Sequence, residues 1–234
     1  MFDPSRNQNH FQLFSLPVSF SLDTEVLAER YRLLRQTVHP DLYATASDRE
    51  KRLALQASTL VNEAYQTLRD PLTRARHLLE VRGGGLGDDQ ETTQDMAFLM
   101  EQMELREALA AARQAPEPHA AIERVRARLE SLADGLIAEM GARLDSGAPG
   151  IGATPAPLPG PVPGTGLGDD VAEVGAPPGQ APDRAPGPSS DQACGSPLDA
   201  AQAAAIRELI RKLQFVRKCE AEAEDLEAEL DEAL

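Results

Sequence analysis

The stretch RLLRQTVHPDLYATAS, residues 32–47, decides the fold of the N-terminal part of the chain because a helical pattern stops inside it. Pro40 cannot continue a helix, and it biases His39 toward an extended backbone, so we expect the helix to end by about Val38. The turn then holds an imidazole and a carboxylate, those of His39 and Asp41, between two helices. Side chains placed in this way could serve catalysis, metal binding or docking to a partner.

Apolar residues recur at helical spacing on both sides of this turn, which predicts an antiparallel pair of helices. Before the turn, after the N-cap candidates Asp23 and Thr24, the apolar stripe is Leu27, Tyr31, Leu34 and Val38. After the turn, the second helix is predicted to begin at the N-cap candidate Ser47 and to end at Asp70. Its stripe is Leu53, Ala57, Leu60 or Val61, Ala64 and Leu68. A short helical turn across the pair contains Phe11, Leu13 and Phe14.

Three further helical segments follow a glycine-containing connection at residues 80–91. Residues 92–145 contain the first two, and residues 199–234 contain the third with its acidic end. The middle segment has apolar residues alternately three and four apart, the pattern of a packed antiparallel helix, at Ile122, Val125, Leu129, Leu132, Leu136 and Met140. Alternation of the kind typical of strands is absent. The sequence therefore predicts an all-α chain, with a helical hairpin in residues 1–79 followed by a three-helix bundle.

Residues 146–198 stand apart because they contain 12 of the 18 prolines and 11 of the 17 glycines. Too few large apolar side chains remain there to offset the entropy of ordering the backbone. We therefore expect a disordered Pro/Gly-rich insertion between the second and third helices of the bundle. Compared with a short loop, the extra length costs about 2 kcal/mol of loop-closure free energy, which a bundle can tolerate.

The formal net charge is −15, but acids and bases are unevenly distributed. Residues 1–70 carry nine acids and eight bases, whereas residues 219–234 carry eight acids and no base. Such an acidic chain argues against nucleic-acid binding, which requires a basic surface. The two cysteines, Cys194 and Cys219, form no paired framework, and no stretch approaches a membrane-spanning length. We therefore expect a cytoplasmic protein with neither nucleic acid nor membrane as a partner.

Catalysis and metal binding both need more than His39 and Asp41. A metal site needs several converging ligands, and the other histidines, His10, His77 and His119, show no ligand spacing. General acid–base catalysis needs a concave pocket, and no nucleophile or phosphate-binding loop accompanies the pair. We therefore expect no metal, no cofactor and no enzymatic activity. Spacing alone leaves open whether the turn is a docking site or only a connection between helices.

The HPD tripeptide at residues 39–41, with ERYRLLRQ before it and VNEAYQTLRDP after it, resembles the J-domain, the module that stimulates ATP hydrolysis by DnaK-type chaperones. The resemblance implies that residues 1–79 form a J-domain. It also implies that His39, Pro40 and Asp41 contact the chaperone near the junction of its nucleotide domain and interdomain linker. Residues on the preceding helix assist in the family, and the matching positions are Tyr31, Arg32 and Arg35.

The segment MAFLMEQMELREALAAA, residues 96–112, carries two apolar stripes on nearly opposite sides. One consists of Phe98, Leu105, Leu109 and Ala112, and the other of Met96, Leu99, Met100 and Met103. One stripe is enough for packing in a small bundle, so the second is either buried under another element or exposed as a binding patch. Phe215, which points away from the apolar stripe of the last helix, raises the same question. Methionine suits adaptable interfaces, and Glu104 and Glu107 nearby favour a partner with basic residues.

Nearly all of the chain outside the Pro/Gly-rich segment resembles the HscB family, the co-chaperones of bacterial iron–sulfur cluster assembly. The motifs that carry this resemblance are DPLTRARHLL, AFLMEQMELRE and RKLQFVRK. It implies that the bundle binds the iron–sulfur scaffold protein IscU and presents it to the dedicated chaperone HscA. The matching scaffold-binding positions are Leu99, Met100, Met103, Glu104, Glu107 and Phe215. The alternative is a general J-domain co-chaperone for unfolded clients, which burial of the methionine stripe would favour.

Overall fold

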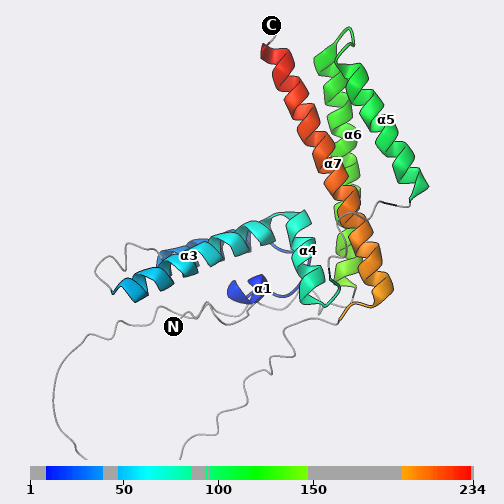
Figure 1. The fold of residues 1–234 in the computed structure, drawn as a ribbon. Helices are drawn as coiled ribbons and strands as arrows, with labels where there is room; N and C mark the ends of the chain where they lie inside the picture. Colours follow the sequence, from blue (N-terminus) through cyan, green and yellow to red (C-terminus); the bar gives the residue numbers. More distant parts are fainter. Residues whose placement is uncertain (1–8, 39–46, 86–92, 94, 147–196, 233–234) are drawn as a thin grey trace, which may run out of the picture.

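A computed structural model describes residues 9–38, 47–85, 93, 95–146 and 197–232 of the chain. All regular secondary structure in these residues is α-helical, which confirms the predicted all-α class. None of these helices is both long enough and apolar enough to cross a membrane. The helices form two arms that meet at a corner, so that the molecule is shaped like an L (Figure 1). We call the first three helices the hairpin arm and the last three the bundle arm, and the fourth helix forms the corner.

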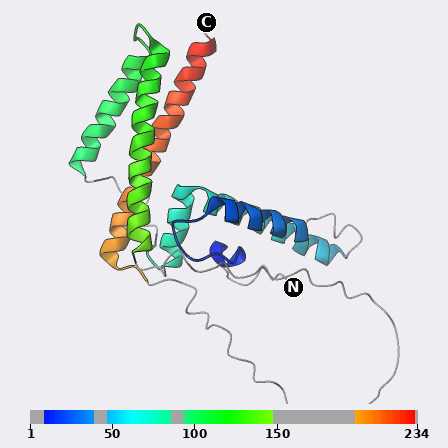
Figure 2. The same ribbon diagram turned by 180° about the vertical axis from the view of Figure 1, so that it is seen from behind.

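The hairpin arm consists of α1 (His10–Leu13), α2 (Thr24–Thr37) and α3 (Asp48–Arg69). Capping side chains set the starts of the two long helices. The Asp23 carboxylate accepts hydrogen bonds from two backbone N–H groups in the first turn of α2, and Ser47 begins α3 with a capping box. Both starts are where the sequence predicted them. The two helices lie side by side with α1 below them (Figure 2).

The core of the hairpin arm confirms most of the predicted stripes. Its buried members from α2, the C-cap of α2 and α3 include Leu27, Leu34, Val38, Ala57, Val61, Ala64 and Leu68. Tyr31 is only half-buried: its ring stacks on Tyr65 with the centroids 4.1 Å apart, and its hydroxyl donates to Asn62 Oδ1 at 2.9 Å. A tyrosine keeps its hydroxyl at the surface because burial without a partner would cost that hydrogen bond. The HPD turn at residues 39–41 lies outside the described residues.

The bundle arm consists of α5 (Met96–Ala112), α6 (Pro118–Asp145) and α7 (Ala200–Glu232). The long helices α6 and α7 run side by side, and α5 covers only the half of this pair that lies away from the corner (Figures 1 and 2). The seam between the three helices is apolar and includes Leu105, Leu109, Ile122, Val125, Leu129, Leu213 and Val216. The predicted three-helix bundle is confirmed in this outer half of the arm.

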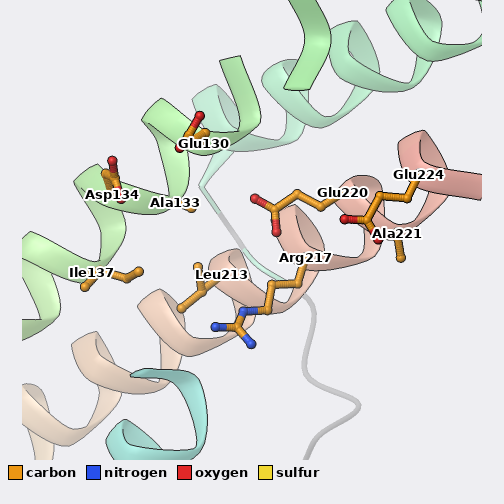
Figure 3. Close-up of a pocket in the computed structure, with 9 residues that line it drawn as sticks. All are labelled: Glu130, Ala133, Asp134, Ile137, Leu213, Arg217, Glu220, Ala221 and Glu224. Atoms are coloured by element: carbon orange, nitrogen blue, oxygen red, sulfur yellow. The ribbon is translucent and has the colours of Figure 1, made fainter. Parts of the chain in front are cut away.

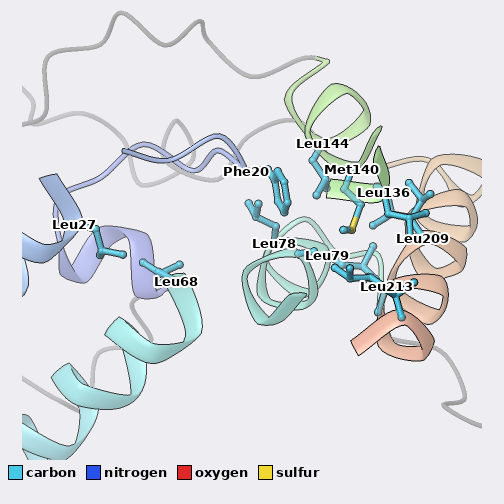
Figure 4. Packing of buried hydrophobic residues seen from close by; sticks show 14 of the residues in the cluster. Phe20, Leu27, Leu68, Leu78, Leu79, Leu136, Met140, Leu144, Leu209 and Leu213 are labelled. Atoms are coloured by element: carbon cyan, nitrogen blue, oxygen red, sulfur yellow. The ribbon is translucent and has the colours of Figure 1, made fainter. Parts of the chain in front are cut away.

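The corner is built around α4 (Pro71–Val81), which lies against the inner ends of α6 and α7. Asp70 ends α3 and caps α4 by accepting a hydrogen bond from the Thr73 N–H, so the chain turns sharply between the two helices. The helix runs into the connection that we predicted from residue 80, and the J-domain boundary at residue 79 stays a prediction. Apolar side chains from both arms meet at α4, among them Phe20, Leu78, Leu79, Leu136, Met140, Leu144 and Leu209 (Figure 4). One continuous core therefore joins the two arms.

A carboxylate at the end of α6 fastens the segment between α1 and α2 to the corner. The Asp145 side chain accepts hydrogen bonds from Ser19 Oγ at 2.9 Å, the Phe20 N–H at 2.8 Å and the Ser21 N–H at 2.9 Å. Burial acts to raise the pKa of Asp145, but these hydrogen bonds outweigh it and hold the pKa below its usual value. The charged form of Asp145 is thus the form that the fold stabilises.

Two buried arginines on α4 and at its C-terminal end complete this polar clamp. The Arg74 guanidinium donates to the Phe20 carbonyl at 2.8 Å. Arg82 donates to the carbonyls of Leu144, at the end of α6, and Val18. Guanidinium groups suit this role because several N–H donors in a fixed plane can satisfy backbone carbonyls from different segments. The clamp therefore ties α4, α6 and the segment before α2 together.

The end of α6 and the start of α7 both lie at the corner (Figures 1 and 2). The Leu198 N–H donates to the Arg82 carbonyl at 3.4 Å, which places the chain before α7 next to the end of α4. Residues 147–196, nearly all of the Pro/Gly-rich segment, lie outside the described residues. The disorder that we predicted for this segment stays a prediction.

Candidate functional site

The predicted chaperone-binding residues fall partly on α2 and partly on the turn after it. The HPD tripeptide at residues 39–41 lies outside the described residues. Arg32 and Arg35 are both exposed on α2, about one turn apart. The Arg32 Nε–H donates to the Ala28 carbonyl of the same helix at 3.3 Å. The last turns of α2 thus present two guanidinium groups just before the position of the HPD turn.

Two further residues of α2 differ in what they offer a partner. Tyr31 holds α2 on α3, because its hydroxyl is hydrogen-bonded to Asn62 and its ring lies on Tyr65. Leu33 is a large apolar side chain that is 46% exposed. Helical spacing places Leu33 outside the core stripe of α2. The sequence pattern indicated no role for this residue. A protein docking on this face of α2 meets apolar as well as basic surface.

The methionine stripe of α5 is exposed. Met96, Met100 and Met103 leave 70%, 60% and 64% of their surface accessible, and Leu99 is half-buried among them. The opposite stripe is buried against the bundle and consists of Phe98, Leu105, Leu109 and Ala112. The sequence left open whether this stripe is buried or exposed, and the structure shows that it is exposed. Burial of the stripe would have favoured a co-chaperone for general unfolded clients.

Phe215 of α7 is brought to the side of α5. Its half-buried ring meets the Phe98 ring edge to face, with the centroids 5.8 Å apart. The Arg106 guanidinium of α5 lies 5.5 Å from the centroid of the Phe215 ring, within cation–π range. Phe215 is therefore part of the surface between α5 and α7, and one of its faces is already in contact with an arginine.

Glu104 and Glu107 lie on the exposed side of α5 and complete the predicted scaffold-binding set. Glu104 is paired within the protein, because Arg128 Nη2 on α6 donates to its Oε2 at 2.8 Å. The same nitrogen lies 3.4 Å from Oε1 of Glu101. These carboxylates, Glu104 first, raise the pKa of Arg128. Sequence reasoning missed Arg128, since a partner 24 positions away on another helix leaves no local pattern.

The first turn of α5, where Met96 lies, is fixed by Asp95. One carboxylate oxygen of Asp95 accepts hydrogen bonds from the Ala97 and Phe98 N–H groups and so caps the helix. The other oxygen accepts a hydrogen bond from Lys212 Nζ of α7 at 2.6 Å. The hydrogen bond from Lys212 is the main reason that the pKa of Asp95 lies below its usual value. The end of α5 at which the methionine stripe begins is therefore anchored to α7.

A groove with a volume of about 350 Å³ lies between α6 and α7 (Figure 3). Its acidic wall is formed by Glu130, Asp134, Glu220 and Glu224. Burial, with Glu224 and Glu130 nearby, raises the pKa of Glu220. Arg217 in the groove pairs with Asp70 at 2.5 Å and so links α7 to the corner.

Within the part of the chain that the structure describes, no three His, Cys, Asp or Glu side chains are placed to hold a metal ion.

Comparison with known sequences finds relatives that are co-chaperone HscB homologs. The model of the HSCB C-terminal oligomerisation domain matches residues 94–149. The co-chaperone protein HscB homolog of Paraburkholderia xenovorans is 46% identical over 147 residues, which cover 62% of this chain and 82% of that protein. The homolog of Shewanella loihica is 44% identical over 138 residues, covering 59% and 80%. For the homolog of Shewanella amazonensis, 48% identity extends over 114 residues, 49% of this chain and 66% of the relative.

Solved structures agree with this result. Chaperone HscB from Vibrio cholerae superposes with a TM-score of 0.64 at 30% identity, covering 95% of this chain and 99% of that chain. The human co-chaperone protein HscB has a TM-score of 0.65 at 22% identity over 96% of this chain and 84% of its own, which shows the common fold. The L-shaped helical fold with an exposed surface on each arm is that of a co-chaperone. The chain belongs to the HscB family of co-chaperones.

Proposed function

We propose that this chain is an adaptor that joins two proteins. Its hairpin arm stimulates ATP hydrolysis by an HscA (DnaK-type) chaperone, and its bundle arm binds an IscU-type iron–sulfur scaffold. By holding both, the chain delivers the scaffold to the chaperone and supports the maturation of iron–sulfur proteins in the cytoplasm. The chain itself makes and breaks no covalent bond.

The observation that carries this proposal is the exposure of Met96, Met100 and Met103 in one row on α5. Apolar surface of this kind favours association, since a partner that covers it removes it from water. Methionine adapts to the shape of a partner, and the carboxylates of Glu104 and Glu107 beside the row attract basic residues. The scaffold contacts Met100 and Met103 of this row together with Leu99 and Phe215, the positions that match the family's pattern.

The hairpin arm stimulates ATP hydrolysis by docking on the chaperone. Arg32 and Arg35 of α2, with the HPD turn at residues 39–41, bind the chaperone in its hydrolysis-competent arrangement better than in its resting arrangement. A hundredfold stimulation requires only about 2.7 kcal/mol of such preferential binding. A few charge-assisted hydrogen bonds are enough for a difference of this size.

The shared core at α4 supports a coupling between the hairpin arm and the bundle arm. Because the arms meet in one continuous core, a scaffold held on α5 stays at a fixed distance from a chaperone held on α2. Binding of the second protein then becomes an encounter within one complex, with a raised effective concentration. The adaptor therefore increases the rate at which this particular pair meets, without contributing a chemical step.

Single-turnover ATP hydrolysis by the organism's HscA-type chaperone tests the proposal. The chain should accelerate hydrolysis, and the IscU-type scaffold should accelerate it further. His39→Gln is expected to remove the acceleration both with and without scaffold. Leu99→Ala/Phe215→Ala is expected to remove only the part that the scaffold adds. Leu55→Ala, which truncates a side chain on α3 that is 60% exposed, serves as the control for loss of apolar surface outside the patch.

Two results would contradict the proposal. Acceleration that survives His39→Gln would mean that the HPD turn is only a connection between helices. A scaffold that adds nothing to hydrolysis, or adds as much with Leu99→Ala/Phe215→Ala as with the unchanged protein, would mean that the bundle arm carries a different cargo.

A further inference from the structure

Arg128 of α6 forms an ion pair inside the proposed scaffold-binding surface. Its guanidinium donates to the Glu104 carboxylate at 2.8 Å and lies 3.4 Å from that of Glu101. The side chains of Arg128 and Glu104 are 47% and 59% exposed, so the pair is open to an approaching protein. Glu107, about one turn further along α5, has no ion-pair partner among the residues that the structure describes.

Glu104 therefore has two candidate partners when a scaffold arrives. A basic side chain of the scaffold has to approach the same carboxylate group, in which Arg128 already holds Oε2. Arg128 also places a positive charge beside the methionine stripe, and this charge repels an approaching cation. Both effects reduce what Glu104 contributes to the binding of a basic partner.

We propose that Arg128 is an internal competitor that tunes the affinity and selectivity of this surface. In the free protein it holds Glu104, and a bound scaffold has to displace it from that carboxylate. A partner with a well-placed arginine or lysine displaces Arg128, whereas a partner without one gains nothing from Glu104. This role of Arg128 rests on the proposed function, in which Glu104 contacts a basic residue of the scaffold.

Arg128→Ala tests this role, and Arg126→Ala is a matched control. Arg126 lies two residues away on the same helix and is 42% exposed. It pairs with Glu227 of α7 at 2.9 Å and with Glu123 of its own helix, and neither acid lies on α5. Both variants change the net charge equally, so a difference between them reports the release of Glu104 and not the overall charge.

Calorimetry with the purified IscU-type scaffold of the same organism gives the affinities at low and high salt. Arg128→Ala is expected to bind about two- to fivefold more tightly than Arg126→Ala at low salt, the range that an exposed ion pair supports. It should also lose more affinity as the salt concentration rises. Glu104→Gln should have little effect by itself but should cancel the gain when combined with Arg128→Ala.

Equal affinities of the two arginine variants would overturn this role. Weaker binding by Arg128→Ala would overturn it as well, because Arg128 would then contact the scaffold directly. Leu99→Ala/Phe215→Ala separates this failure from failure of the proposed function. If that double variant binds normally, the surface is not the scaffold site. If it loses binding while the arginine variants agree, the scaffold site stands and only the competitor role falls.

Discussion

His77 of α4 is half-buried against His10, and the two imidazole rings stack with their centroids 4.2 Å apart. The Nε2 atom of His77 accepts a hydrogen bond from the His10 backbone N–H at 3.1 Å, so this nitrogen carries no proton. Burial, with a smaller effect of His10, lowers the pKa of His77 to about 4. Burial also lowers the pKa of His10. Two neutral imidazoles therefore hold α1 on the corner.

We expect the free energy of unfolding to decrease as the pH falls from about 6.5 toward 4. Below the ordinary pKa of 6.5 the unfolded chain takes up a proton at His77, which the folded chain cannot accept until the pH reaches about 4. The contribution of His77 is therefore fully present above pH 6.5 and is lost through this range. Urea unfolding at several pH values measures the slope.

Two variants separate His77 from other titrating groups. His77→Gln offers a carbonyl oxygen to the His10 N–H and cannot titrate, so its stability should depend less on pH in this range. His119→Gln is the control because it changes a side chain of α6 that is 45% exposed. Its free energy of unfolding should depend on pH with the same slope as in the unchanged protein. A His77→Gln slope equal to that of the unchanged protein would contradict the assignment.

Among the helices, the starts and ends could be predicted because a capping side chain and its N–H partner lie within three residues. Asp23, Ser47 and Asp70 are read from the sequence in this way. The two stripes of α5 also followed from local spacing. Their different exposure did not, since spacing does not say whether another helix covers a face. Only the position of α5 on the outer side of the bundle arm decides it (Figure 1).

The anchored start of α5 predicts a link between a helix cap and scaffold binding. Asp95→Ala removes the cap and the ion pair with Lys212, which should lower stability and loosen the turn that contains Met96. Scaffold affinity, measured by calorimetry, should fall several-fold. Asp23→Ala removes the cap of α2 in the same way and should lower stability but leave scaffold affinity unchanged. An equal loss of affinity in both variants would show that general destabilisation is responsible.

For the molecule as a whole, the two arms could be predicted but their junction could not. Each arm follows from stripes and caps within a few tens of residues. The contacts of Asp145 with Ser19, Phe20 and Ser21 join residues 124 to 126 positions apart, and no local pattern specifies such partners. Arg128 escaped prediction for the same reason. The HPD turn is the reverse case, since its motif is plain in the sequence and it lies outside the described residues.

The clamp at the corner predicts that Asp145→Ala loosens the junction. The substitution leaves the Phe20 and Ser21 N–H groups without their acceptor, which should destabilise the protein by about 1–3 kcal/mol. Hydrogen exchange followed by mass spectrometry should show faster exchange in residues 18–22. The added effect of scaffold on chaperone ATP hydrolysis should decrease as the arms lose their fixed angle.

Asp134→Ala is the control for this loosening, because it removes an exposed carboxylate of the same helix that lies in the groove wall away from the clamp. Exchange in residues 18–22 should then stay as in the unchanged protein. Unchanged exchange in Asp145→Ala would mean that the apolar core at α4 holds the junction without help from the clamp.

The meeting of the α6 end and the α7 start at the corner has a consequence for the evolution of the gene. Coding sequence gained or lost between them alters neither the row of methionines nor the arginines of α2, because both surfaces lie on other helices (Figure 1). Loop-closure free energy rises only slowly with length, so selection for stability opposes such changes weakly. The junction is therefore a position where lineages can differ in chain length while keeping the same two exposed surfaces.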